Sequence, residues 1–147
     1  MKLEHRVTVD APRAAVWAVL MDLPVAAGCV PGTRDIAPED DGVRGTLDVH
    51  VGPVKLALAG RVAVESRDET AGKARLRADA EDQRIGGAVR AFVDLAVSGD
   101  APTELRVSSD VAILGRIGEL GQPLIARQAD KVLAGFADCL RRTVAAR

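Results

Sequence analysis

Few side chains in this sequence could do acid–base or nucleophilic chemistry. His5 and Ser109 fall on the apolar side of predicted strands, whereas His50 alternates onto the charged side. An imidazole beside a hydroxyl can form a nucleophilic site, but a third group must orient the imidazole. The sequence places no evident carboxylate for that role. We therefore interpret His5 as a hydrogen-bonded wall residue of the interior, with a polar contact to a ligand head group and a catalytic role as the alternatives.

Cys29 and Cys139 are far apart in the chain and share no motif. The prediction is two buried, reduced thiols, and a disulfide on parity alone is the alternative. One inward histidine and two scattered cysteines do not provide the three or four ligands of a metal site. The sequence also has no phosphate-binding glycine loop and no flavin or nicotinamide motif. We therefore predict no metal, no cofactor and no catalytic residue, and hence a protein that is not an enzyme.

The composition indicates a single domain that spans residues 1–147. A hydrophobic content of 48% argues against disorder. The 20 basic and 21 acidic residues are interspersed and give a net charge of −1. The sequence therefore predicts no basic surface of the kind that binds nucleic acid. The first residues do not resemble a signal peptide, and no apolar run approaches the roughly 20 residues that span a bilayer. We expect a soluble, cytoplasmic protein.

The longest periodic segment runs from Gln122 to Ala146 and predicts an amphipathic helix. Apolar residues recur on it at steps of three and four, and charged residues occupy the opposite side. Such a stripe needs a second surface to pack against. The stripe consists of Ile125, Ala129, Val132, Leu133, Phe136, Leu140 and Val144.

Most of the remaining chain alternates with a period of two, which predicts strands with one apolar and one solvated face. Residues 2–9 form the first such run, and two short helices then lead to Pro31-Gly32. Short turns between alternating strands predict antiparallel pairing. The predicted fold class is therefore α+β, with a sheet of six to seven strands whose apolar face is covered by the C-terminal helix. The later strand runs are 43–51, 54–65, 74–81, 89–97 and 105–113.

The apolar face of the predicted sheet carries many small side chains, among them Gly60, Ala78 and Ala91. Protein interiors normally pack densely, so a wide sheet lined by small residues leaves volume unless larger side chains close it. We hypothesise that this volume forms an apolar ligand pocket. The alternative is that leucine side chains and the helix stripe close the gap. Trp17 has two corresponding interpretations, as a core anchor of the first helix or as a gate at the pocket mouth.

Three short motifs occur in order along this pattern. They are Asp10-Ala11-Pro12 before Val16-Trp17, then Cys29-Val30-Pro31-Gly32, then Val51-Gly52-Pro53-Val54 with Gly60 downstream. In these residues the sequence resembles the CoxG family of carbon monoxide dehydrogenase subunits, which belongs to the START-like, polyketide-cyclase-related superfamily (SRPBCC). The resemblance extends over nearly the whole chain. It implies a helix-grip fold, in which a curved antiparallel sheet wraps around the C-terminal helix and two short helices lie between the first two strands.

The resemblance also implies a hydrophobic cavity and a function. Members of the family are linked to molybdenum hydroxylases, either by attaching them to the membrane or by supplying a lipophilic electron carrier. We therefore expect non-catalytic binding of a lipid or isoprenoid quinone, a carbon monoxide dehydrogenase or related redox enzyme as partner, and peripheral contact at the inner face of the membrane. The predicted cavity-lining residues are His5, Trp17, Leu20, Cys29, Val30, Leu47, Val49, Leu58, Leu76, Ala78, Ala91, Val93, Ser109, Val111, Ile125, Ala129, Val132, Leu133 and Phe136.

Two other classes of function remain open at this point. One is an enzyme of the polyketide cyclase or aromatase type, which would act on a bound hydrophobic substrate through His5, Ser109 or a neighbour. The other is a ligand-free interaction adaptor with a closed, dry core. Loss of turnover in a His5→Ala variant would favour the enzyme, and a structure without an internal space would favour the adaptor.

Overall fold

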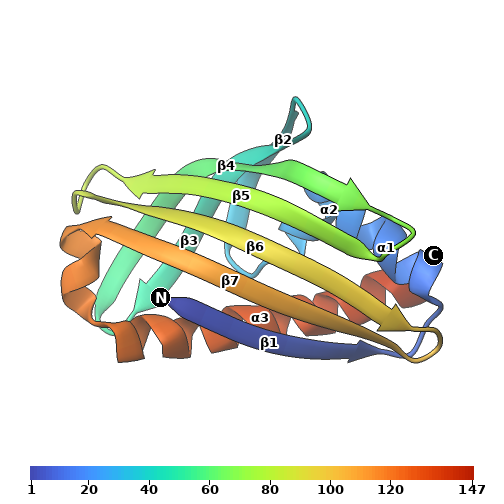
Figure 1. The fold of residues 1–147 in the computed structure, drawn as a ribbon. Helices are drawn as coiled ribbons and strands as arrows, with labels where there is room; N and C mark the ends of the chain where they lie inside the picture. The colour runs from blue at the N-terminus through green and yellow to red at the C-terminus, as the bar shows by residue number, and fades with distance from the viewer.

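Figure 1 shows the fold of residues 1–147 in the computed structural model, a long curved sheet with one long helix running beneath it. One strand and two short helices precede six consecutive strands, and a 3₁₀ helix then leads into the long helix. In chain order they are β1 (Lys2–Val9), α1 (Arg13–Met21), α2 (Leu23–Gly28), β2 (Thr33–Glu39), β3 (Gly42–Val51), β4 (Val54–Asp68), β5 (Lys73–Asp82), β6 (Gly87–Gly99), β7 (Thr103–Gly115), the 3₁₀ helix η1 (Arg116–Leu120) and α3 (Gln122–Ala145).

The seven strands form one antiparallel sheet in the order β1-β7-β6-β5-β4-β3-β2. Strands β2 to β7 follow one another as hairpins, and β1 pairs with β7 at the far edge. The predicted α+β helix-grip class, with two short helices between the first two strands, is confirmed. β2 is the strand that alternation did not reveal. Its pairing with β3 shifts register between Arg34 and Ala37, so a simple period of two is interrupted there.

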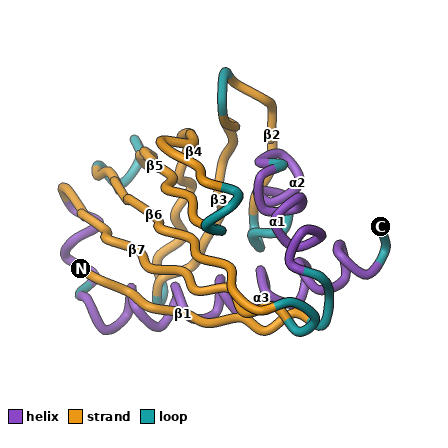
Figure 2. Tube along the Cα trace, turned by 45° about the vertical axis from the view of Figure 1, so that its right-hand side comes forward, coloured by secondary structure: helices purple, strands orange, loops and turns teal.

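α3 runs along the arched sheet without touching all of it. Its main contacts are with α1 and β1 on one side and with β3 and η1 on the other, whereas β4, β5 and β6 have at most marginal contact with it. Figure 2 shows this arrangement from a second angle, with the middle strands standing off from α3. None of the helices is both long and apolar enough to cross a membrane. The helix is therefore held at the two flanks of the sheet.

Two separate clusters of buried residues make these contacts. The first joins α1 and the C-terminal half of α3 to one end of the sheet, with Val16, Leu105 and Leu140 fully buried at its centre. Trp17 belongs to this cluster at 6% exposure, as its interpretation as a core anchor requires. The second cluster is smaller and consists of Val49, Val51, Leu56 and Ile117. Burial of these side chains supplies most of the apolar stabilisation of the fold.

The prediction of two reduced thiols is wrong, because Cys29 and Cys139 form a disulfide with a Cα–Cα distance of 5.2 Å. The pairing follows from how the loop after α2 packs on α3. A Cβ on Gly135 would lie 2.5 Å from Cγ of Pro31, so only glycine lets this loop approach the helix so closely. Cys139 lies four residues further along α3, on the same face, and meets Cys29, two residues before Pro31. The disulfide thus fastens the α2–β2 connection to α3.

Candidate functional site

Between the two buried clusters, the inner face of the sheet carries side chains that the core does not cover. Two rows of cross-strand partners on β4, β5, β6 and β7 define this middle section. Every residue of both rows is partly exposed, although nearly all are apolar. The first row is Val62, Ala78, Ala91 and Val111, and the second is Val64, Leu76, Val93 and Ser109.

The exposure of this middle section has a physical cause. α3 is held against β1 and β3, and the arch of the sheet carries β5 and β6 away from it. Ala78 and Ala91 lie opposite each other at the centre and are too short to bridge the separation. Apolar side chains on the face that is turned toward the helix are therefore partly exposed. A partly exposed apolar surface facing a helix is a candidate for binding a small molecule.

The structure brings some of the predicted lining residues to this middle section, but not all of them. Six of them belong to the two rows, namely Leu76, Ala78, Ala91, Val93, Ser109 and Val111, and of these Leu76 and Val93 also pack against the first cluster. His5 lies one row further along, where it pairs with Val107. Ala129 and Val30 are partly exposed on α3 and after α2. Trp17 and Leu20 are packed inside the first cluster, and Cys29 is in the disulfide. The others pack in or against the two clusters: Leu47, Val49, Leu58, Ile125 and Val132 at the second, and Leu133 and Phe136 at the first.

His5 has a carboxylate partner that sequence reasoning missed. Its Nε2 lies 2.8 Å from Oδ1 of Asp130 on α3, and its side chain is 15% exposed. Asp130 itself is 70% exposed, so the pair closes the edge between β1 and α3. Ser109 shares the inner face with His5 because His5 pairs with Val107, two residues before Ser109 on β7. No hydrogen bond joins the imidazole to the Ser109 hydroxyl.

A small hollow of about 240 Å³ lies between the α2–β2 loop, β3 and α3. Its polar lining includes Asp48, His50 and Lys131. Arg34 donates to Asp48 at 2.6 Å, and this hydrogen bond, opposed by desolvation, keeps the pKa of the Asp48 carboxyl below its ordinary value. Lys131 has no ion-pair partner. The hollow can hold a small polar group, and His50 is exposed there as its alternation predicts.

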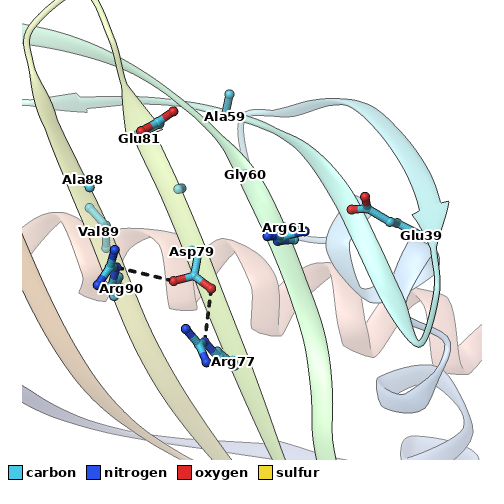
Figure 3. Close-up of a pocket in the computed structure, with 11 residues that line it drawn as sticks. Glu39, Ala59, Gly60, Arg61, Arg77, Asp79, Glu81, Ala88, Val89 and Arg90 are labelled. Atoms are coloured by element: carbon cyan, nitrogen blue, oxygen red, sulfur yellow. Dashed lines mark hydrogen bonds and ion pairs between the residues drawn. The ribbon is translucent and has the colours of Figure 1, made fainter.

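A larger hollow of about 430 Å³ lies on the opposite face of the sheet (Figure 3). Figure 3 shows its charged side chains on the near side of the strands, with α3 behind them. Asp79 is 3.2 Å from Nε of Arg77 and 3.7 Å from Nε of Arg90. The hollow exists because Ala59 and Ala88 are small, but its lining is charged and solvated. We therefore place the candidate site on the inner face.

Two sets of residues were absent from the sequence prediction. Val62 and Val64 extend the two rows onto β4, and their alternation with Arg61 and Glu65 could have identified them. Asp130 could have been suspected from its place between Ala129 and Lys131, at the border of the apolar stripe. Its pairing with His5 depends on how β1 lies along α3, which periodicity does not fix.

This architecture recurs in solved structures. A conserved protein from Geobacillus kaustophilus has a TM-score of 0.87 at 18% identity, covering 99% of this chain and 95% of that one. The Zhui aromatase/cyclase from Streptomyces sp. R1128 has a TM-score of 0.69 at 19% identity, covering 98% and 93%. A START superfamily protein from Mycobacterium smegmatis has a TM-score of 0.65 at 15% identity, covering 97% and 96%. At such identities the likeness shows the fold alone, which is START-like.

Within this class the family is defined by sequence. The family model of the carbon monoxide dehydrogenase subunit CoxG matches residues 6–145, so the chain belongs to that family. The match covers all but a few residues at either end and confirms the resemblance seen in the sequence motifs. No curated protein matches the sequence.

Proposed function

We propose that the protein binds a hydrophobic small molecule in the space between the middle of the sheet and α3. The observation that supports this is the partly exposed middle section, in which Ala78 faces Ala91 across β5 and β6. In a domain without a ligand, apolar side chains in such a position would be expected to pack against each other. An apolar ligand would remove them from water at roughly 25 cal/mol per Å² of buried surface.

The proposed ligand is a lipid or isoprenoid quinone-like molecule, and the protein presents it to a redox enzyme of the molybdenum hydroxylase type. Membership of the CoxG family supports a carbon monoxide dehydrogenase or a related enzyme as the partner. A long apolar ligand would have to come from a bilayer, so we also propose peripheral contact with the inner face of the membrane. We propose that the binding itself involves no catalytic residue, metal or other cofactor.

Native mass spectrometry of the purified protein tests this proposal directly. The expected result is a mass above that of the chain, which returns to the chain mass after solvent extraction and releases an identifiable lipid or quinone. The extracted protein should then take up a quinone with an isoprenoid tail from detergent. If the purified protein carries nothing and the extracted protein takes up no apolar compound, the interaction adaptor becomes the better account.

One observation favours a second candidate, an enzyme of the polyketide cyclase or aromatase type. Asp130 orients His5, which supplies the third group that the sequence did not show. A solved aromatase/cyclase shares the fold. In this second candidate the imidazole removes a proton from a bound hydrophobic substrate. Turnover of such a substrate that is lost in His5→Ala would establish the enzyme, and binding without turnover would support the carrier.

A further inference from the structure

One buried side-chain polar atom in the molecule has no hydrogen-bond partner, and it lies next to the candidate site. It is Nδ1 of His5. The other ring nitrogen, Nε2, is occupied by Asp130 at 2.8 Å. Buried polar atoms are nearly always hydrogen-bonded, because leaving one unpaired costs about 1–3 kcal/mol. An unpaired atom next to the partly exposed apolar rows indicates a missing partner.

The chemistry of the pair sets what this partner must be. An ionised carboxylate only accepts hydrogen bonds, so Nε2 of His5 must carry the proton and donate to Asp130. In a neutral imidazole the other nitrogen, Nδ1, then has a free lone pair and can only accept. The Ser109 hydroxyl lies on the same face of the sheet, yet no hydrogen bond joins it to Nδ1. The atom therefore requires a donor from outside the chain.

We propose that the ligand of this site is an apolar molecule with a hydroxyl group, and that Nδ1 of His5 accepts a hydrogen bond from that hydroxyl. Asp130 is a positioning residue that fixes the tautomer of His5. The inference rests on the proposed binding function and specifies the ligand class, an alcohol or a phenol. For a quinone-like ligand it selects the reduced, hydroxyl-bearing form over the oxidised form, whose carbonyl oxygens cannot donate.

The position of His5 supports a role in recognition. It pairs with Val107 of the first cluster, while the next β1 residue on the same face, Leu3, pairs with Ser109, so His5 lies at the border between that cluster and the row that contains Val93 and Ser109. Its side chain is 15% exposed while Nδ1 is fully buried, so a donor reaches that atom only when the side chains that cover it move aside. A site that hydrogen-bonds a hydroxyl rejects analogues that lack it, because its own polar group would then stay unpaired.

The test uses solvent-extracted protein and two fluorescent probes of nearly equal shape, 1-naphthol and 1-methoxynaphthalene. Only the first can donate a hydrogen bond. Dissociation constants are measured for wild type, His5→Phe and the control His50→Phe, which replaces the exposed histidine outside the candidate site. The preference for the naphthol over its methyl ether should be about tenfold greater in wild type than in His5→Phe, which corresponds to one hydrogen bond to a buried acceptor. His50→Phe should keep the preference of wild type.

Asp130 provides a second variant at an exposed position that does not threaten folding. Asp130→Ala should reduce the preference for the naphthol, and Asp130→Asn should restore it because the amide oxygen still accepts from Nε2. A preference that is equal in wild type, His5→Phe and Asp130→Ala, with both probes bound, overturns the inference and leaves the proposed binding function standing. Failure of wild type to bind either probe contradicts the proposed function itself. Retained binding of the methyl ether by His5→Phe shows that this variant is folded.

Discussion

Replacing Ala78 with phenylalanine distinguishes an open interior from a packed one. Ala78 lies in the middle section, opposite Ala91, and is partly exposed. The same strand provides a matched control in Ala74, which faces the same side, lies opposite Leu95 and is 5% exposed within the first cluster. The two substitutions add identical atoms to the same strand. They differ only in whether the space in front of the side chain is filled.

The structure gives opposite expectations for the two variants. At Ala74 the new ring has no room, and overpacking a core costs about 1–3 kcal/mol or more. At Ala78 the ring enters the proposed ligand space, and if it buries roughly 100 Å² of its surface it gains about 2.5 kcal/mol at 25 cal/mol per Å². Ordering the side chain offsets roughly 0.5–1 kcal/mol of that gain. Ala78→Phe should therefore be neutral or mildly stabilising, while Ala74→Phe is destabilising.

Calorimetric melting and guanidinium unfolding of the solvent-extracted variants measure the difference. With about 2–4 °C per kcal/mol for a domain of this size, Ala74→Phe should lower Tm by roughly 3–10 °C. Ala78→Phe should keep or raise Tm and should lose binding of 1-methoxynaphthalene, because the ring occupies the ligand space. If Ala78→Phe destabilises as much as Ala74→Phe, the middle of the sheet is packed shut and the reasoning is refuted. If it folds normally and still binds, the ligand lies elsewhere.

Three further predictions concern the framework. The disulfide closes a loop of 110 residues, so Cys139→Ala should lower the free energy of unfolding by about 4–5 kcal/mol and Tm by roughly 10–15 °C. Two titratable thiols in the native, unreduced protein would contradict the pairing. Asp82, 2% exposed, accepts from the backbone N–H groups of Ala57, Ile85 and Arg84, which hold the pKa of its carboxyl below its ordinary value. A carboxyl whose pKa is lowered in the folded state contributes stability above about pH 4, and this contribution is lost as acid protonates the group. Asp82→Asn should therefore have a lower Tm at pH 7 and lose less Tm than wild type below about pH 4. An acid profile of Tm equal to that of wild type would contradict this role. Leu105 is 0% exposed, so Leu105→Ala should lower the free energy of unfolding by about 2–5 kcal/mol. A decrease below about 1 kcal/mol would mean that the first cluster is loosely packed.

Periodicity was sufficient to predict the α+β class because this sheet is solvated on one face, whereas the helix-grip fold was implied by the family resemblance. Charged residues such as Arg75 and Arg77 alternate with Leu76 and Ala78, so the inner face could be identified directly from the sequence. The helix was equally visible, since its apolar stripe is continuous from Ile125 to Val144. β2 escaped detection because its register shift breaks the alternation. The motifs that supported the family resemblance are confirmed by the match over residues 6–145.

The features that the sequence did not show are pairings across the chain. The disulfide joins residues 110 positions apart, and the hydrogen bond between His5 and Asp130 joins residues 125 positions apart. Each depends on where α3 lies relative to an element near the N-terminus. A period of 3.6 or 2 gives the face on which a residue lies, but not its neighbour on another element. The clue for the disulfide was Gly135 in the middle of a helix, one turn before Cys139, where a close approach was needed.

The division of the core into two clusters explains how the middle of the sheet can stay partly exposed in a domain of this size. Leu105 and Leu140 at one end, and Leu56 and Ile117 at the other, are almost completely buried. They hold α3 to the two flanks of the sheet, and the disulfide adds a covalent tie on the side of α2. Because stabilisation is concentrated at the ends, the middle can remain uncovered without loss of the fold. A ligand that fills the middle should then raise Tm by the free energy of its own binding, and its exchange should not require unfolding of either cluster.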